Sequence, residues 1–470
     1  MLGGALASPG ATGWTLRVEL SVHDSLDPAF AASWPSWQVE YATCLKLVNQ
    51  NRYGKLVTEA APWPRVSRDG RTYTFIVRPR FTRFSNGDPV TAASFARQIT
   101  RLKGPYGSPG RRFAADVARV RASGSVLSIR LRRPANDFLS RVAMPYFCAI
   151  ARSHPPIARY PEGTIHSAGP YYAHRAEGGE LVLRRNSHYR GPRPRGPQVI
   201  EITGESGLAA LDRVESGVVH VAGNFELPAG RRLSTSRIRN VPLPGVVALL
   251  FGTGPGKAFA NPNLRKAAAL AVDRTAVAGR RGTATDTLIP PAMPGYRRAR
   301  AYPRRPTADS LDRARRLARG LVPVSVYGRG SPYPHEREFR ESLRAIGINT
   351  GFLRTTDCDQ NADFYILLIP TEYDDPAGAL RYIAREELKV DCYWPWSFDT
   401  SWRPQLQRAL RLRGPARHRE LSALEGKLVR DRAIAVGLYQ PRATWLVSAR
   451  IGCFRPHRVY QVDIAALCLR

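Results

Sequence analysis

The chain has 470 residues, of which 43% are hydrophobic, and its mean hydropathy is −0.31. These values are typical of a globular protein of about two to four domains, and no apolar run in the sequence approaches the length of a membrane-spanning helix. The formal net charge of +33 favours attraction to anionic surfaces, but Arg is spread along the whole chain and no nucleic-acid-binding signature accompanies it.

The first residues predict a flexible start, then a strand and a helix. Residues 1–13 lack the basic and apolar regions of a signal peptide, although residues 5–7 match an A-x-A cleavage pattern. We expect the remnant of a truncated signal segment, and a plain flexible tail is the alternative. Residues 14–22 predict a strand, and the mixed aromatic and apolar run at 37–47 predicts a helix.

The clearest local pattern lies between residues 71 and 102. Residues 72–77 alternate as a strand with one preferred face does, and Asn86-Gly87 is a turn pair. Thr91 is a good N-cap for the helix that follows. That helix has an apolar stripe made of Phe95, Ile99 and Leu102.

The middle of the chain alternates short predicted strands and helices. The predicted elements are a strand at 126–131, a helix running into a strand at 136–150, a strand at 199–202, a helix at 207–217 and a strand at 246–251. Asn261 is a good N-cap and Pro262 suits the first helical position, which together predict a helix over 261–272. Residues 252–257 (GTGPGK) lack the spacing of a phosphate-binding loop.

The last third of the chain predicts α/β structure. A helix is expected at 309–320, closed by Gly320, and a long amphipathic helix at 415–436. The strand, helix and strand expected at 322–327, 335–346 and 349–353 form a βαβ unit with parallel pairing, and 364–369 predicts a buried strand.

Three stretches, in this order, resemble the family 5 extracytoplasmic solute-binding proteins of ABC importers. The first is Leu56 to Ala61 followed by Asp69 to Phe75, Phe84 to Gly87 and Thr91-Ala92; the second is Gly169 to Tyr172 with Leu181 to Gly191; the third is Asn261 to Arg274. The resemblance covers essentially the whole chain. His220 departs from it, because the family usually has Asp there.

The resemblance implies an α/β fold of the periplasmic-binding-protein type II-like class. Such a fold has three lobes, a discontinuous first lobe and an interlobe ligand cleft. The boundaries expected here are 1–42, 167–243 and 437–470 for lobe I, 43–166 for the small lobe II, and 244–436 for lobe III.

The resemblance also indicates where a ligand would bind. In peptide-binding relatives a carboxylate after a strand meets the ligand ammonium, and Glu372 stands at that position. Ile369 replaces the usual Trp three residues earlier. Ligand contact by Glu372 and simple surface exposure are both open.

Aromatic side chains are the other expected ligand contacts. A stacking wall for the ligand is the functional interpretation, and packing within a lobe is the alternative. Gly252 directly follows Phe251, and this Phe-Gly pair stands where relatives often have an Asn after the strand. The expected residues are Trp394, Trp396, Phe398, Trp37, Tyr41 and Phe251.

The six cysteines are independent thiols in a cytosolic protein, and they tend to pair in an exported one. No Cys or His spacing indicates a metal site, so no metal or other cofactor is expected. From the segments expected to be neighbours we predict three disulfides, namely Cys44–Cys148, Cys358–Cys392 and Cys453–Cys468.

The implied function is capture without catalysis. A monomeric, extracytoplasmic protein would hold a peptide-like or other small polar solute between its lobes and deliver it to ABC permease subunits, without binding specific nucleic acid. One alternative is a basic protein that binds nucleic acid or another polyanion, because the net charge is +33. The other alternative is an enzyme with its site in the cleft, although no convincing catalytic motif is present.

Overall fold

The computed structural model describes residues 14–22, 24–78, 83–104, 107–154, 163–176, 180–194, 196–204, 207–223, 232–291, 293, 301–321, 326–330, 336–353, 362–371, 373–384 and 399–470. The chain divides into two compact units. Unit 1 comprises Met1–Arg133, Val142–Val241 and Thr444–Arg470, and unit 2 comprises Pro134–Arg141 and Pro242–Ala443. No helix within the described ranges is long and apolar enough to cross a membrane. The division into three lobes stays a prediction.

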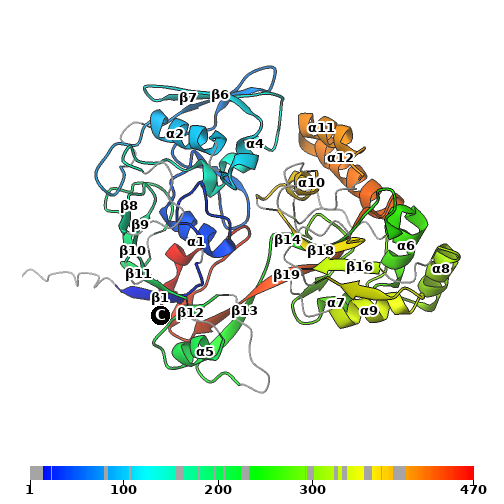
Figure 1. Cartoon of the computed structure of the whole chain (residues 1–470). Coiled ribbons are helices and arrows are strands. Elements are labelled where there is room, and N and C mark those ends of the chain that lie inside the picture. Colours follow the sequence, from blue (N-terminus) through cyan, green and yellow to red (C-terminus); the bar gives the residue numbers. More distant parts are fainter. Residues whose placement is uncertain are drawn as a thin grey trace, which may run out of the picture. The chain divides into compact units, whose positions relative to one another are not determined.

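A mixed sheet forms one part of unit 1 (Figure 1). Its strand β1 (Thr15–Glu19) pairs in parallel with two strands, and antiparallel strands extend the sheet from there. Leu16 and Val18 share one face of β1 and are fully buried, whereas Arg17 between them is exposed on the other face. The order is β12 (Val221–Ala222), β1, β11 (Val199–Thr203), β10 (Leu181–Arg185), β9 (Tyr171–Arg175) and β8 (Gly163–Ile165).

A second sheet in unit 1 has four antiparallel strands. It includes the strand predicted within residues 71–102, and the helix predicted there packs against it. Its order is β4 (Arg65–Val66), β5 (Thr72–Ile76), β7 (Val126–Leu131) and β6 (Val117–Ser123). Helix α2 (Ala92–Lys103) packs against β6 and β7 with its apolar stripe. At its start the Thr91 N–H donates to Ser94 Oγ at 3.2 Å, so Ser94 supplies a side-chain cap as well.

Helix α1 (Trp34–Thr43) begins three residues before the predicted helix at 37–47 and ends four residues before its predicted end. Cys44 is extended, and the chain then follows the segment around Ala60, whose N–H donates to the Lys46 carbonyl at 3.0 Å. This long-range pairing overrides the local helical pattern after Thr43. The prediction was therefore wrong for residues 44–47.

The prediction for residues 136–150 was also partly wrong. Helix α4 (Phe138–Val142), which belongs to unit 2 except for its last residue, is present, but it is followed by a short 3-10 turn over Pro145–Phe147 in unit 1 and by no strand at 148–150. Proline supplies no N–H to a strand ladder. The other elements of unit 1 are β2 (Val48–Gln50), β3 (Leu56–Thr58), α3 (Arg111–Ala114), α5 (Gly207–Glu215), β13 (Ser236–Pro242), β20 (Ile451–Cys453), β21 (Pro456–His457), β22 (Gln461–Val462), η5 (Ile464–Ala466) and β23 (Cys468–Leu469).

The sheet of unit 2 confirms the predicted order and parallel pairing of the βαβ unit, although the strand predicted at 322–327 overlaps β16 only at Val326 and Tyr327, and residues 322–325 lie outside the described ranges. Strand β16 (Val326–Gly330) pairs in parallel with β17 (Thr350–Phe352) and with β18 (Phe364–Pro370). Helix α9 (Glu336–Arg344) lies between the first two in the chain. Beyond β18 the sheet continues with β14 (Gly245–Phe251) and then β19 (Ala435–Ser448). Strand β19 also pairs with β15 (Gly282–Ala284).

Unit 2 has further helices around this sheet. The cap of α6 is as predicted, because Asn261 Oδ1 accepts from the Asn263 N–H at 2.9 Å. The long helix predicted at 415–436 ends earlier: α12 (Gly414–Gly426) passes into one π-helical turn at Lys427–Asp431, and Ala433 has a φ of 48°, which breaks the helix before β19. The remaining elements are η2 (Ala258–Ala260), α6 (Pro262–Ala271), α7 (Arg274–Ala278), α8 (Ala308–Ala318), α10 (Ala377–Ile383) and α11 (Arg403–Arg411).

Candidate functional site

Three of the residues predicted to contact a ligand can be placed. Trp37 and Tyr41 lie on α1 in unit 1, and Phe251 ends β14 in unit 2. Glu372, Trp394, Trp396 and Phe398 lie outside the described residues, as does the predicted pair Cys358–Cys392.

The residues on both sides of Glu372 are fixed in unit 2. Strand β18 ends at Pro370, and the Thr371 N–H and hydroxyl both donate to the Pro244 carbonyl, at 2.6 and 2.7 Å. On the other side, the Tyr373 hydroxyl donates to Asp137 Oδ2 at 3.0 Å. Thr371 and Tyr373 are both buried. The described residues on either side of the predicted anchor are therefore both held by hydrogen bonds.

Asp137 is the hub of the polar contacts beneath this loop. Its carboxylate accepts from Tyr373 and from Arg381, whose Nε lies 2.6 Å away, and it pairs with Arg141 at 3.4 Å. Burial alone would raise the pKa of Asp137, but the guanidinium groups of Arg141 and Arg381 hold it well below its ordinary value. Asp137 is therefore ionised at neutral pH.

The Asp375-Pro376 dipeptide after this loop has a structural role. Asp375 Oδ1 accepts from the Ala377 N–H at 2.9 Å, which caps α10. The same carboxylate forms a two-pronged ion pair with Arg417 of α12, at 2.5 and 3.0 Å. Asp-Pro pairs are typical of turns, and these contacts tie the turn at Asp375-Pro376 to a second helix.

Phe251 lies in the hydrophobic core of unit 2. Its side chain is fully buried, and its ring centroid is 4.6 Å from that of Phe259. In the sheet it stands opposite Phe364 of β18. This packing is that of a core residue, and ligand contact by Phe251 stays a prediction.

Trp37 and Tyr41 are buried in unit 1 with partners of their own. Trp37 Nε1 donates to the Ala31 carbonyl at 3.0 Å. The Tyr41 hydroxyl donates to the Gln50 carbonyl at 3.3 Å, and its ring stacks on Tyr460 with centroids 4.6 Å apart. Both side chains therefore contribute to the packing of α1, and their contact with a ligand also stays a prediction.

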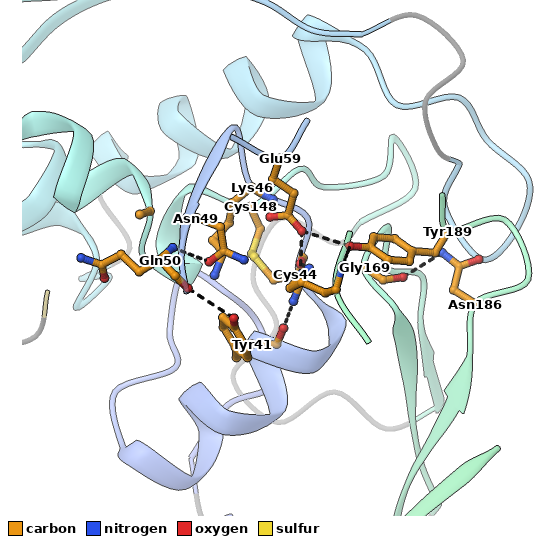
Figure 2. A network of polar contacts seen from close by, with 12 residues as sticks. Tyr41, Cys44, Lys46, Asn49, Gln50, Glu59, Cys148, Gly169, Asn186 and Tyr189 are labelled. Carbon is orange, nitrogen blue, oxygen red and sulfur yellow. Dashed lines mark hydrogen bonds and ion pairs between the residues drawn. A yellow bond between two sulfur atoms is a disulfide. The ribbon is translucent and has the colours of Figure 1, made fainter. Parts of the chain in front are cut away.

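A buried polar network surrounds the end of α1 (Figure 2). Glu59 is its central carboxylate: it accepts from the Lys46 N–H at 3.2 Å, from the Tyr189 hydroxyl at 3.3 Å and from Arg193 Nε at 2.6 Å. The Arg193 guanidinium also donates to the carbonyls of Tyr41 and Cys44. The network thus holds the chain after α1 against the segment at 189–193.

Lys46 is the unusual member of this region. Its side chain is fully buried, its Nζ has no hydrogen-bond partner among the described residues, and it lies 4.5 Å from the centroid of the Tyr41 ring. Burial and the nearby Arg193 lower the pKa of Lys46 well below its ordinary value. Burial also raises the pKa of Asp463, a charged neighbour, to about 6.

Two predicted disulfides are present in the structure, Cys44–Cys148 and Cys453–Cys468. The first joins Cys44, at the end of α1, to a cysteine 104 positions later in the chain. The second joins two cysteines that are 15 positions apart. In the described ranges no group of three or more His, Cys, Asp or Glu side chains is arranged to hold a metal ion.

Several residues of these networks were not predicted from the sequence. Arg381 pairs with Asp137, and Arg193 pairs with Glu59, across 244 and 134 positions, and no local spacing marks these two pairs. Glu59 and Tyr189 belong to stretches that carry the family resemblance, and this was the only signal that pointed to them.

The fold and the sequence together define a class of protein. The family model described as bacterial extracellular solute-binding proteins, family 5 Middle, matches residues 25–320. The chain belongs to this family. Its mixed α/β fold is accordingly of the type II-like class of periplasmic binding proteins, as the sequence predicted.

Individual relatives agree with this assignment. Protein XP55 of Streptomyces lividans is 29% identical over 238 residues, which are 46% of this chain and 41% of that protein. The oligopeptide-binding protein OppA of Bacillus subtilis is 26% identical over 322 residues, 60% of this chain and 57% of that protein. The chain thus aligns with about two fifths to three fifths of the length of these relatives. The solved structure of clavulanic acid biosynthesis oligopeptide binding protein 2 superposes with a TM-score of 0.82 at 21% identity, over 97% of this chain and 95% of that one.

Proposed function

We propose that this chain is the solute-binding component of an ABC importer, which captures a peptide-like or other small polar solute and delivers it unchanged to a membrane permease. Membership of the solute-binding family supports the binding role. The names of OppA and of the solved relative support a peptide-like ligand. We further propose that the protein acts outside the cytoplasm as a monomer, without catalysis and without a cofactor.

The observation that carries the proposal is the placement of Thr371 and Tyr373, the described neighbours of Glu372 in the chain. Both are buried and hydrogen-bonded. Flanking residues that are ordered before binding reduce the entropy that a ligand must overcome. We propose that Glu372 anchors a cationic group of the ligand, and that the aromatics Trp394, Trp396 and Phe398 contribute apolar contacts.

The test combines ligand identification with one substitution. Native mass spectrometry of the protein purified from its own host would show the ligand carried along, and titration calorimetry would measure its affinity. For a ligand with an ammonium group we expect Glu372→Gln to weaken binding by about tenfold or more, because a charge-assisted hydrogen bond is worth about 1.5–3 kcal/mol.

Glu341→Gln on the exposed face of α9 is the matched control, and it should leave the affinity unchanged. Equal affinities of the Glu372→Gln variant and the unaltered protein would show that the anchor lies elsewhere. Chemical turnover of the bound peptide would overturn the proposal of a binding protein without catalysis.

A further inference from the structure

One face of the four-stranded sheet in unit 1 is open to solvent. The side chains of Tyr73, Phe75, Leu127 and Ile129 are buried on the face that α2 covers. Because side chains alternate along a strand, the residues between them point to the other face. Figure 1 shows α2 on one side of β6 and β7 and no labelled element on the other side.

The strand register aligns four arginines on this outer face. Arg65, Thr74, Ser128 and Arg121 form one cross-strand row over β4, β5, β7 and β6, as the register gives them as consecutive partners. Thr72, Arg130 and Arg119 form the next row. All four arginines are exposed, and none of them forms an ion pair with a carboxylate in the part of the chain that the structure describes.

The same face has an apolar row at one end. Ile76 and Val126 are cross-strand partners, and 54% and 40% of their surfaces are exposed. Trp63 precedes Arg65 by two residues, just before β4 begins, and is 53% exposed. Trp63, Ile76 and Val126 are three of the eight large hydrophobic residues that are exposed in the described part of the chain, so this sheet carries a local concentration of them.

We propose that this outer face (Trp63, Arg65, Ile76, Arg119, Arg121, Val126 and Arg130) binds the surface of an anionic lipid bilayer. Arginines near an anionic headgroup layer attract it, and each contributes independently. Trp and aliphatic side chains beside them can enter the boundary between headgroups and acyl chains. The proposal rests on the face alone and stands or falls independently of the ligand proposed above.

A lipid surface fits this face better than nucleic acid does. Sites for single-stranded nucleic acid interleave aromatic rings with basic groups so that successive bases can stack. Here the arginine rows contain no aromatic residue, and the apolar side chains are two aliphatic ones and one Trp at one end. An exposed sheet face that is basic, carries the hydroxyl groups of Thr72, Thr74 and Ser128, and has apolar side chains at one end matches a headgroup layer.

The test measures binding of the full-length protein to vesicles of phosphatidylcholine and phosphatidylglycerol by co-sedimentation. We expect binding to the mixed vesicles and little binding to pure phosphatidylcholine. Replacing Arg65, Arg119, Arg121 and Arg130 together by Gln should weaken binding by tenfold or more, since each arginine adds to the attraction. The control replaces four exposed arginines of unit 2 (Arg313, Arg316, Arg319 and Arg408) by Gln and should change binding by less than about threefold.

A second variant tests the apolar row. Trp63→Ser with Ile76→Ser keeps all arginines and should weaken vesicle binding severalfold while leaving retention on DNA unchanged. Equal losses of vesicle binding in the arginine variant and its control would show that net charge alone is responsible, and would overturn the proposal.

A different result would assign the face to nucleic acid instead. In that case the protein would bind DNA saturably, the arginine variant would lose this DNA binding, and Trp63→Ser with Ile76→Ser would leave vesicle binding unaffected. Circular dichroism melting verifies that each variant is folded, and the double variant Arg121→Gln with Arg130→Gln replaces the fourfold one if that does not fold.

Discussion

Lys46 shows how one buried charge affects stability. The folded protein keeps its amine away from water and gives its Nζ no hydrogen-bond partner among the described residues. A buried ammonium group without such partners costs free energy unless it loses its proton. The lowered pKa of Lys46 expresses this cost, because unfolding restores an ordinary lysine that binds a proton more tightly.

We therefore expect Lys46→Met to stabilise the protein at pH 7 by about 1–3 kcal/mol. The folded-state pKa of Lys46 is depressed, so its penalty grows as the pH falls below the unfolded value of about 10.4. The difference between variant and unaltered protein should thus shrink as the pH rises towards that value. Denaturant unfolding at pH 7 and pH 9.5 measures both effects, and Lys55→Met at an exposed position is the control. A destabilised Lys46→Met variant would indicate that the contacts of the ammonium with Tyr41 and Tyr460 exceed its burial cost.

At the scale of elements, local patterns predicted the segments with strong periodicity and failed where distant contacts decide. The strand at 72–76, the helix at 262–271 and the βαβ unit were predicted because their apolar spacing, caps and lengths agree. The ends of α1 and α12 were wrong. Pairing with the segment around Ala60 ends the first, and the positive φ of Ala433 ends the second. Neither cause leaves a mark in the nearby sequence.

The candidate site also has one part that the sequence predicted and one part that it did not. The position of Glu372 after the strand at 364–369 followed from the family resemblance. The hub at Asp137 could not be predicted, because its partners Tyr373 and Arg381 are more than 200 positions away.

The two disulfides close stretches of chain of different lengths, and this difference predicts how much each one stabilises the folded protein. Replacing Cys44 and Cys148 by Ser should destabilise the protein more than replacing Cys453 and Cys468, because the closed stretch is 104 rather than 15 residues. The loop-entropy model gives about 4.7 and about 3 kcal/mol for loops of these sizes. Denaturant unfolding of both double variants tests the order. Equal losses would show that effects other than loop closure dominate.

At the scale of the whole molecule, each of the two units contains its own segments of the chain, and the stability of each unit can be measured separately. Pro134–Arg141 belongs to unit 2, although the chain on both sides of it belongs to unit 1. Within unit 2 this segment is held by Asp137 and by Asn136, whose N–H donates to the Leu410 carbonyl at 3.0 Å. The stability of unit 2 thus depends on residues that lie far from the rest of it in the sequence.

We expect Asp137→Asn to destabilise unit 2 by about 3 kcal/mol, because it removes one partner from a buried ion-pair cluster. Calorimetry should show two transitions, of which only that of unit 2 moves to lower temperature. The folded-state pKa of Asp137 is depressed, so its contribution is present above the unfolded value of about 3.9 and is lost as the pH falls below it. The two proteins should therefore become more alike towards pH 2.

Asp312→Asn is the control, because the Asp312 carboxylate pairs with Arg315 on an exposed helix face, and it should change stability by less than about 1 kcal/mol. If both calorimetric transitions moved together in the Asp137→Asn variant, the units would unfold as one cooperative body.

The order of segments along the chain also affects how the protein is made. The strand pair Val221 with Val447 and the disulfide at Cys468 both need residues 444–470, which are translated after the whole of unit 2. Unit 2 does not need residues 444–470 and can therefore fold before they are in place, whereas β12 keeps an unpaired edge until they are. Such an edge is open to pairing with other chains. The polypeptide is thus most exposed to aggregation in the interval before its C-terminal stretch pairs with β12.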